Sequence, residues 1–123
     1  MKRLKTYEAV SREYLDNQVL DIRIGPYTKN DLKKMFEVGD IVISNKWNSF
    51  YFRNEKAVIV KLRWEPYDGY VKFKYLNSSL RNPEHNNENV DDGGYRMLLY
   101  VDKVGHMSKE ELELWLNAEK YNL

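Results

Sequence analysis

Residues 57–76, AVIVKLRWEPYDGYVKFKYL, contain two stretches in which apolar and polar residues alternate, separated by a tight turn. A period of two with β-branched and aromatic residues is typical of strands that bury one face, so the segment predicts a β-hairpin. The residues expected to face the core are Val58, Val60, Leu62 and Trp64 in the first strand and Val71, Phe73 and Tyr75 in the second.

The opposite face of this hairpin collects positive charge. It carries Lys61, Arg63, Tyr70, Lys72 and Lys74, which we call the basic face. Like charges across a pair of strands are destabilising, so the pattern needs an explanation. Cations beside an aromatic ring can follow a phosphate backbone while bases stack on the ring. A solvated face that is neutralised elsewhere in the fold is the alternative interpretation.

Turn and capping signals divide the rest of the chain into short elements. We expect a helix over residues 6–15, strands over 20–24, 41–44, 50–52 and 95–101, and helices that begin after Thr28 and Ser108. Thr28 and Ser108 are each followed three residues later by an acid, Asp31 and Glu111, as in a capping box. The predicted fold is α+β: a small antiparallel, SH3-like β-barrel or curved sheet with short N-terminal helices and a C-terminal helix. Residues 1–123 are expected to form one domain.

Residues 77–94 contain few apolar residues and predict a long polar, acidic loop. Loops of this length in compact domains are often functional. The candidate binding residues of this segment and its flank are Glu84, His85, Glu88, Asp91, Asp92 and Arg96. A calcium loop is not predicted, because Asp92 stands where its glycine belongs and Leu98 where its bidentate glutamate belongs. No metal or cofactor is therefore expected.

The chain offers little for catalysis. It has no cysteine, two histidines (His85 and His106), and no P-loop, GxGxxG or GxSxG motif. No catalytic residue is predicted, and His106 is expected to make a local hydrogen bond. A metal-dependent hydrolase built from the acids of residues 84–92 and the two histidines is the second alternative.

Charge is unevenly distributed along the chain. Residues 1–76 have 15 Lys/Arg and 10 Asp/Glu, a net charge of +5, whereas residues 77–123 have 5 and 9, a net charge of −4. Such asymmetry is typical of a polarised surface that meets a charged partner. The basic N-terminus lacks the apolar run of a signal peptide, and no stretch is apolar enough to span a membrane. We therefore expect a soluble, cytoplasmic protein without a membrane partner.

These patterns predict a non-enzymatic binding protein with a charge-split, Tyr-rich surface. The richness in Asn, Lys and Tyr suggests a phage or mobile-element effector that blocks or sequesters a host factor, either a nucleic-acid-handling protein or a nucleotide. Direct binding of nucleic acid through the basic face is the alternative function. A Tyr-rich face or an unpaired sheet edge could also form a homodimer.

Overall fold

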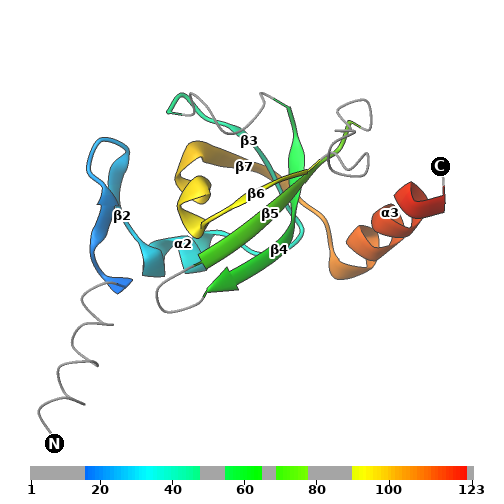
Figure 1. The fold of residues 1–123 in the computed structure, drawn as a ribbon, viewed down its shortest axis with the longest axis horizontal. Coiled ribbons are helices and arrows are strands. Elements are labelled where there is room, and N and C mark those ends of the chain that lie inside the picture. The colour runs from blue at the N-terminus through cyan, green and yellow to red at the C-terminus, as the bar shows by residue number, and fades with distance from the viewer. Residues whose placement is uncertain (1–15, 48–54, 65–68, 78–89, 122–123) are drawn as a thin grey trace, which may run out of the picture.

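In the computed structural model, a five-stranded antiparallel sheet lies between a two-stranded hairpin and a C-terminal helix (Figure 1). The structure describes residues 16–47, 55–64, 69–77 and 90–121, with side chains described as far as residue 118. Its elements are β1 (Val19–Asp21), β2 (Gly25–Thr28), α2 (Lys29–Met35), β3 (Asp40–Ser44), β4 (Ala57–Trp64), β5 (Gly69–Tyr75), β6 (Val90–Gly93), the 3-10 helix η3 (Tyr95–Tyr100), β7 (Val101–His106) and α3 (Lys109–Tyr121). The strand order in the larger sheet is β6-β5-β4-β3-β7.

The predicted hairpin of residues 57–76 is confirmed as β4 and β5, but the alternation changes phase within β4. Ile59 pairs with Phe73, whereas Lys61 pairs with Lys72, so β4 contains one extra residue between these two pairs. A β-bulge of this kind transfers the residues that follow it to the other face of the sheet. The β4 residues that reach the main core are Ala57 and Ile59 before the bulge, and Leu62 and Trp64 after it.

The expectation that Val58 and Val60 face this core is wrong for the same reason. Val58 is fully buried outside the main core cluster and pairs with Lys74, whereas Val60 is only half-buried. The Lys74 Nζ lies 5.5 Å from the ring centroid of Trp115 in α3. The C-terminal helix therefore approaches the second face of the sheet near Lys74.

The main core lies on the first face of the sheet, where α2 and η3 pack. Leu32 and Phe36, from α2 and its C-terminal cap, are buried with Leu98 and Leu99 of η3. Complete burial of each large apolar side chain contributes roughly 1.5–3 kcal/mol, so these contacts account for much of the attachment of both helices. At Gly69 a side chain would overlap the ring of Tyr95, so glycine lets η3 approach β5 closely.

The strand expected over residues 20–24 is instead a tight hairpin formed by β1 and β2. The Asp21 carboxylate accepts a hydrogen bond from the backbone N–H of Arg23 at 3.0 Å and another from its guanidinium at 2.8 Å. A side chain that bonds the backbone two residues later favours a turn, and it leaves Ile22 88% exposed. Gly25, at φ +152°, begins β2 rather than ending a strand.

A 3-10 helix occupies most of the strand that was expected over residues 95–101. The backbone N–H of Met97 donates to the Gly94 carbonyl at 3.0 Å, and the neighbouring residues Leu98 and Leu99 are both buried. Burial of two successive side chains is incompatible with the alternation of a strand that buries one face. The strand β7 begins only at Val101.

Both predicted capping boxes are confirmed. In α2 the Asp31 N–H donates to Thr28 Oγ1 at 3.2 Å, and in α3 the Glu111 N–H donates to Ser108 Oγ at 3.1 Å. Lys29, the first residue of α2, is buried. Its Nζ lies 3.4 Å from Asp16 Oδ1 and 5.4 Å from the ring centroid of Tyr95.

The expected α+β fold with an antiparallel sheet is confirmed, but closure into an SH3-like barrel is wrong. In the described part of the chain, β6 pairs with β5 alone and β7 with β3 alone, so these two strands are the edges of an open sheet. A barrel requires the edge strands to pair with each other. The long loop also ends earlier than expected, since residues 90–93 form β6.

Several expected elements cannot be compared. The helix at residues 6–15, the strand at 50–52 and residues 78–89 of the loop lie outside the described residues. None of the described helices combines the length and apolar character that crossing a membrane requires.

Candidate functional site

The basic face is assembled by the register of β4 and β5. Lys61 pairs directly with Lys72, and Arg63 pairs with Tyr70, two residues further along both strands. Lys74 lies two residues beyond Lys72, so its side chain is on the same side of the sheet. The five residues predicted for this site therefore share one face of one hairpin.

In the part of the chain that the structure describes, no ion pair neutralises three of these four cations. Within the described residues, Lys61, Arg63 and Lys74 form none, and Lys61 and Arg63 are exposed. Two of the ammonium groups lie near aromatic rings instead. The Lys61 Nζ is 5.8 Å from the ring centroid of Tyr70, and that of Lys74 lies near Trp115. Cation–π contacts of this kind leave the positive charge available to an anion.

Two acids of the predicted loop lie beside this hairpin, because β6 is the neighbour of β5. Asp92 pairs in register with Lys72 and accepts a hydrogen bond from the Tyr70 hydroxyl at 3.2 Å. Asp91 points to the other face and accepts a hydrogen bond from the Tyr75 hydroxyl. Partial burial, together with the hydrogen bond to Asp92, raises the pKa of Tyr70. Both carboxylates thus have partners inside the fold.

The remaining loop candidates do not gather into one site with these acids. Glu84, His85 and Glu88 lie outside the described residues. Arg96 is exposed on η3, and its charge is a minor contribution to the lowered pKa of Asp21, which hydrogen bonds from Arg23 chiefly cause. No contact joins Arg96 to the basic face within the described residues.

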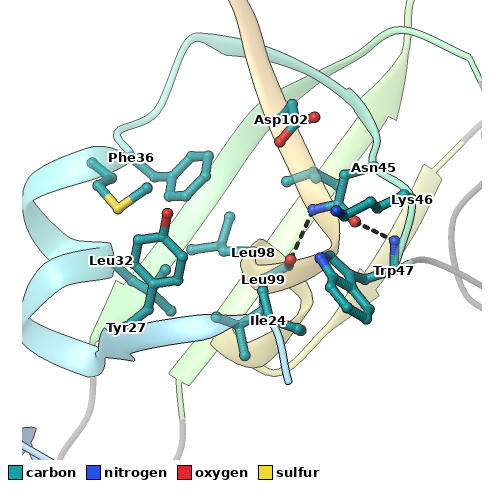
Figure 2. A pocket seen from close by; sticks show the side chains of 12 residues that line it. Ile24, Tyr27, Leu32, Phe36, Asn45, Lys46, Trp47, Leu98, Leu99 and Asp102 are labelled. Carbon is teal, nitrogen blue, oxygen red and sulfur yellow. Dashed lines mark hydrogen bonds between the residues drawn. The ribbon is translucent and has the colours of Figure 1, made fainter. Parts of the chain in front are cut away.

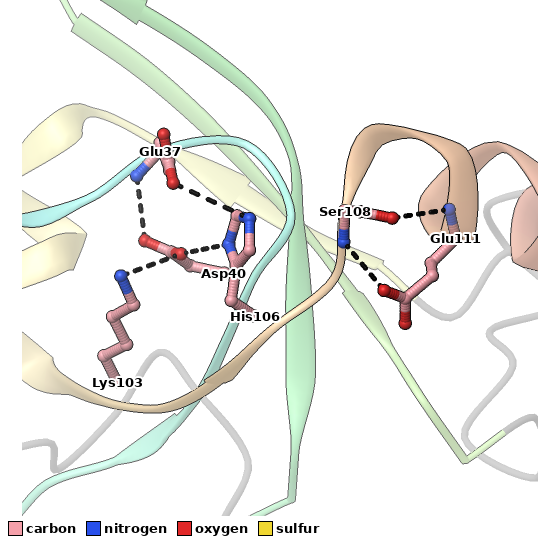
Figure 3. A network of polar contacts seen from close by, with 6 residues as sticks. All are labelled: Glu37, Asp40, Lys103, His106, Ser108 and Glu111. Carbon is pink, nitrogen blue, oxygen red and sulfur yellow. Dashed lines mark hydrogen bonds and ion pairs between the residues drawn. The ribbon is translucent and has the colours of Figure 1, made fainter.

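His106 belongs to a polar cluster at the opposite edge of the sheet (Figure 3). Its Nδ1 lies 2.7 Å from Oδ1 of Asp40, a residue 66 positions away, so the expected local hydrogen bond is wrong. The same Oδ1 lies 3.1 Å from the Lys103 Nζ, and Oδ2 accepts a hydrogen bond from the Glu37 N–H at 2.9 Å. The His106 Nε2 is also 3.6 Å from a Glu37 oxygen.

This cluster contains atoms that could coordinate a metal ion. However, its buried carboxylate already has a cationic partner within the protein. Potential ligand atoms of Glu37, Asp40 and His106 lie within 4.8 Å of one another. However, Asp40 is completely buried, and its carboxylate already receives the Lys103 ammonium, a cation that a metal ion would have to displace. We interpret the cluster as compensation of a buried carboxylate.

A pocket of about 300 Å³ opens on the core face of the sheet, where residues from several elements meet (Figure 2). The β1–β2 hairpin, α2, η3, the loop that follows β3 and the start of β7 all contribute to it. Its lining residues are Ile24, Tyr27, Leu32, Met35, Phe36, Asn45, Lys46, Trp47, Leu98, Leu99, Val101 and Asp102. Most of these residues are apolar or aromatic, but polar and apolar atoms contribute about equally to the surface of the opening.

Sequence reasoning did not find this pocket. Its lining residues span positions 24 to 102, and no short motif connects them. Trp47, in the polar loop after β3, lines this pocket. A large aromatic residue between polar neighbours was the one local signal, and it could not indicate which elements would surround it.

Comparison with known proteins gives no family for this chain. No protein-family model matches it, and no curated protein or solved structure does so either.

Proposed function

We propose that this protein is a non-enzymatic binding protein whose basic face contacts the phosphate backbone of a nucleic acid. One observation carries the proposal: the direct pairing of Lys61 with Lys72, with Arg63 and Lys74 on the same face. A pair of like charges directly across a sheet costs the fold stability. An anionic partner would turn this cost into favourable interactions.

The surroundings of these cations support a phosphate backbone as the partner. Lys61 and Arg63 are exposed, and they form no ion pair within the described residues. Neighbouring side chains on one strand face lie about 6.6 Å apart, a spacing that places successive cations along an extended strand. Tyr70 and Trp115 supply aromatic surface within the same area. Cations with adjacent aromatic groups are the usual elements of single-strand binding sites.

The other predicted functions have less support. For contact with a basic partner through the acidic loop, Asp91 and Asp92 are partly engaged already, because each accepts a hydrogen bond from a tyrosine. A hydrolase that joins these acids to His106 requires groups from opposite edges of the sheet. Four strand spacings separate β6 from β7, roughly 19 Å along the sheet.

The proposed binding of nucleic acid would also allow the protein to act on a host factor. A phage or mobile-element protein that covers host nucleic acid would also block the proteins that handle it. A pull-down from a host lysate, with and without nuclease, separates the two routes. Loss of the captured proteins after nuclease treatment supports nucleic acid as the bridge, whereas their retention indicates direct contact with a host protein.

The direct test measures the binding of a fluorescein-labelled 20-nucleotide single strand at several salt concentrations. If about four phosphates are neutralised, the logarithm of the association constant falls with the logarithm of salt at a slope of roughly −3. The double variant Lys61→Gln/Arg63→Gln should lower the magnitude of this slope by about 1.4.

The matched control removes the same charge elsewhere. Lys33→Gln/Lys34→Gln changes two exposed lysines of α2 and should leave the slope unchanged. Equal effects of the two double variants would assign binding to net charge alone. The absence of binding at low salt would exclude the function.

A further inference from the structure

Two pairs of a cation and an aromatic ring lie on the basic face. The Lys61 Nζ is 5.8 Å from the ring centroid of Tyr70, and the Lys74 Nζ is 5.5 Å from that of Trp115. Both distances are close to the limit of a cation–π contact, roughly 6 Å, so an ammonium group loses little when it turns toward a phosphate. Each pair therefore offers a cation and a ring side by side, which match the phosphate and the base of a nucleotide.

The two pairs lie at opposite ends of the basic face. Tyr70 is near the start of β5 and Lys74 near its end, where Trp115 of α3 meets the face. The four residues from Tyr70 to Lys74 span about 13 Å of extended strand. Neighbouring nucleotides in one strand of a duplex are only about 3.4 Å apart along its axis. One ligand can thus reach both rings only if its bases are separated from each other.

The fold holds both rings in place and leaves part of each accessible. Tyr70 and Trp115 are half-buried. The Tyr70 hydroxyl donates a hydrogen bond to Asp92 Oδ2 at 3.2 Å. Trp115 lies one helical turn after Leu112, which is buried, on the helix that Ser108 caps. Rings fixed in this way are preorganised for stacking, since little side-chain entropy remains to be lost.

We propose that the basic face selects unpaired strands, with one base stacked on Tyr70 and another on Trp115. This inference rests on the nucleic-acid binding proposed above and specifies which form of nucleic acid is bound. A base in a duplex is stacked between its neighbours, whereas an unpaired base can be splayed out onto an aromatic ring. Every base has a π-face, so the two rings bind without a strong preference for sequence.

Fluorescence anisotropy with three labelled ligands of equal length tests this selectivity. They are oligothymidine, a DNA duplex and a strand of abasic sites. Charge alone favours the duplex, which has the highest density of phosphates. With base stacking, oligothymidine should bind about tenfold more tightly than the abasic strand, which has the same number of phosphates. It should also bind more tightly than the duplex at the same salt concentration.

Variants of the two rings show whether stacking causes this preference. Trp115→Leu should weaken the binding of oligothymidine about tenfold and leave the abasic strand unchanged, because it removes stacking surface but no charge. Tyr70→Leu should act in the same way. Trp115→Phe and Tyr70→Phe keep an aromatic ring and should retain most of the binding.

Trp47→Leu is the matched control. The Lys46 Nζ lies 5.1 Å from the Trp47 ring centroid, a pair of the same kind, but Trp47 lines the pocket on the core face. Its replacement should change the binding of none of the three ligands. A thermal melt of each variant shows whether the fold is kept.

Different outcomes contradict the selectivity and the proposed function. If none of the three ligands binds at low salt, the basic face does not bind nucleic acid and both proposals fail. Equal binding of oligothymidine and the abasic strand, or tighter binding of the duplex, overturns the selectivity alone. An equal loss of both single strands in Trp115→Leu would assign a structural role to the indole. Tighter binding of oligothymidine by this variant would show that the indole competes with phosphate for Lys74, and either result overturns stacking on Trp115.

Discussion

Asp40 is a charged residue inside the fold that depends on specific partners. Its side chain is completely buried, and a buried carboxylate is tolerated only when charges and hydrogen bonds compensate it. His106, Lys103 and the backbone of Glu37 provide this compensation (Figure 3). No buried side-chain nitrogen or oxygen in the described residues lacks a partner.

Lys103→Met tests this role, because methionine keeps an apolar stem of similar length but removes the charge. We expect a loss of about 1.5–3 kcal/mol in the free energy of unfolding, the range for a hydrogen bond to a charged group. Urea denaturation at neutral pH measures it. Lys33→Met, at an exposed position of α2, is the control, and an equal effect of both substitutions would contradict the role of Lys103.

At the scale of elements, the first turn of α2 depends on a reciprocal cap. Thr28 Oγ1 accepts the Asp31 N–H at 3.2 Å, while Asp31 Oδ2 accepts the Thr28 N–H at 2.8 Å. This helix has seven residues, too few to be stable alone, so the cap and the burial of Leu32 must hold it together. We expect Thr28→Ala to cost about 1 kcal/mol of unfolding free energy in urea denaturation.

The same cap should give the protein a measurable dependence on pH. Hydrogen bonds from the Thr28 backbone and then its hydroxyl lower the pKa of Asp31 below 3.8 in the folded state. The stabilisation by ionised Asp31 is therefore present above the unfolded pKa and is lost as the pH falls through the folded pKa. In urea denaturation from pH 7 to pH 2.5, the deficit of Asp31→Asn relative to the parent should shrink below about pH 4. A deficit that is constant with pH would show that the charge of Asp31 contributes nothing.

At the scale of the whole molecule, the nucleic-acid binding that we propose for the basic face would come at a cost in stability. Lys61 directly opposes Lys72, so Lys61→Glu should raise the unfolding free energy by about 0.2–1 kcal/mol. The same substitution should weaken oligonucleotide binding. Arg63→Gln is the informative comparison, because Arg63 faces Tyr70 and its loss should weaken binding without this gain. Urea denaturation and fluorescence anisotropy measure the two effects, and a loss of stability in Lys61→Glu would contradict the trade-off.

The sequence by itself determined those features that depend on local patterns. The hairpin of residues 57–76, the capping boxes at Thr28 and Ser108, and the gathering of the five basic-face residues all follow from side-chain periodicity or from hydrogen bonds within three residues. These interactions join residues only a few positions apart, so the number of residues between them nearly determines their geometry.

Only the tertiary structure decided features that depend on what each segment packs against. The bulge in β4 and the 3-10 conformation of Tyr95–Tyr100 do not follow from the alternation of apolar residues, and Lys29 is buried where Asp16 and Tyr95 meet its ammonium group. The partnership of His106 with Asp40 and the pocket between residues 24 and 102 join segments far apart in the chain. No local pattern encodes such contacts, since they exist only once the sheet has brought its strands together.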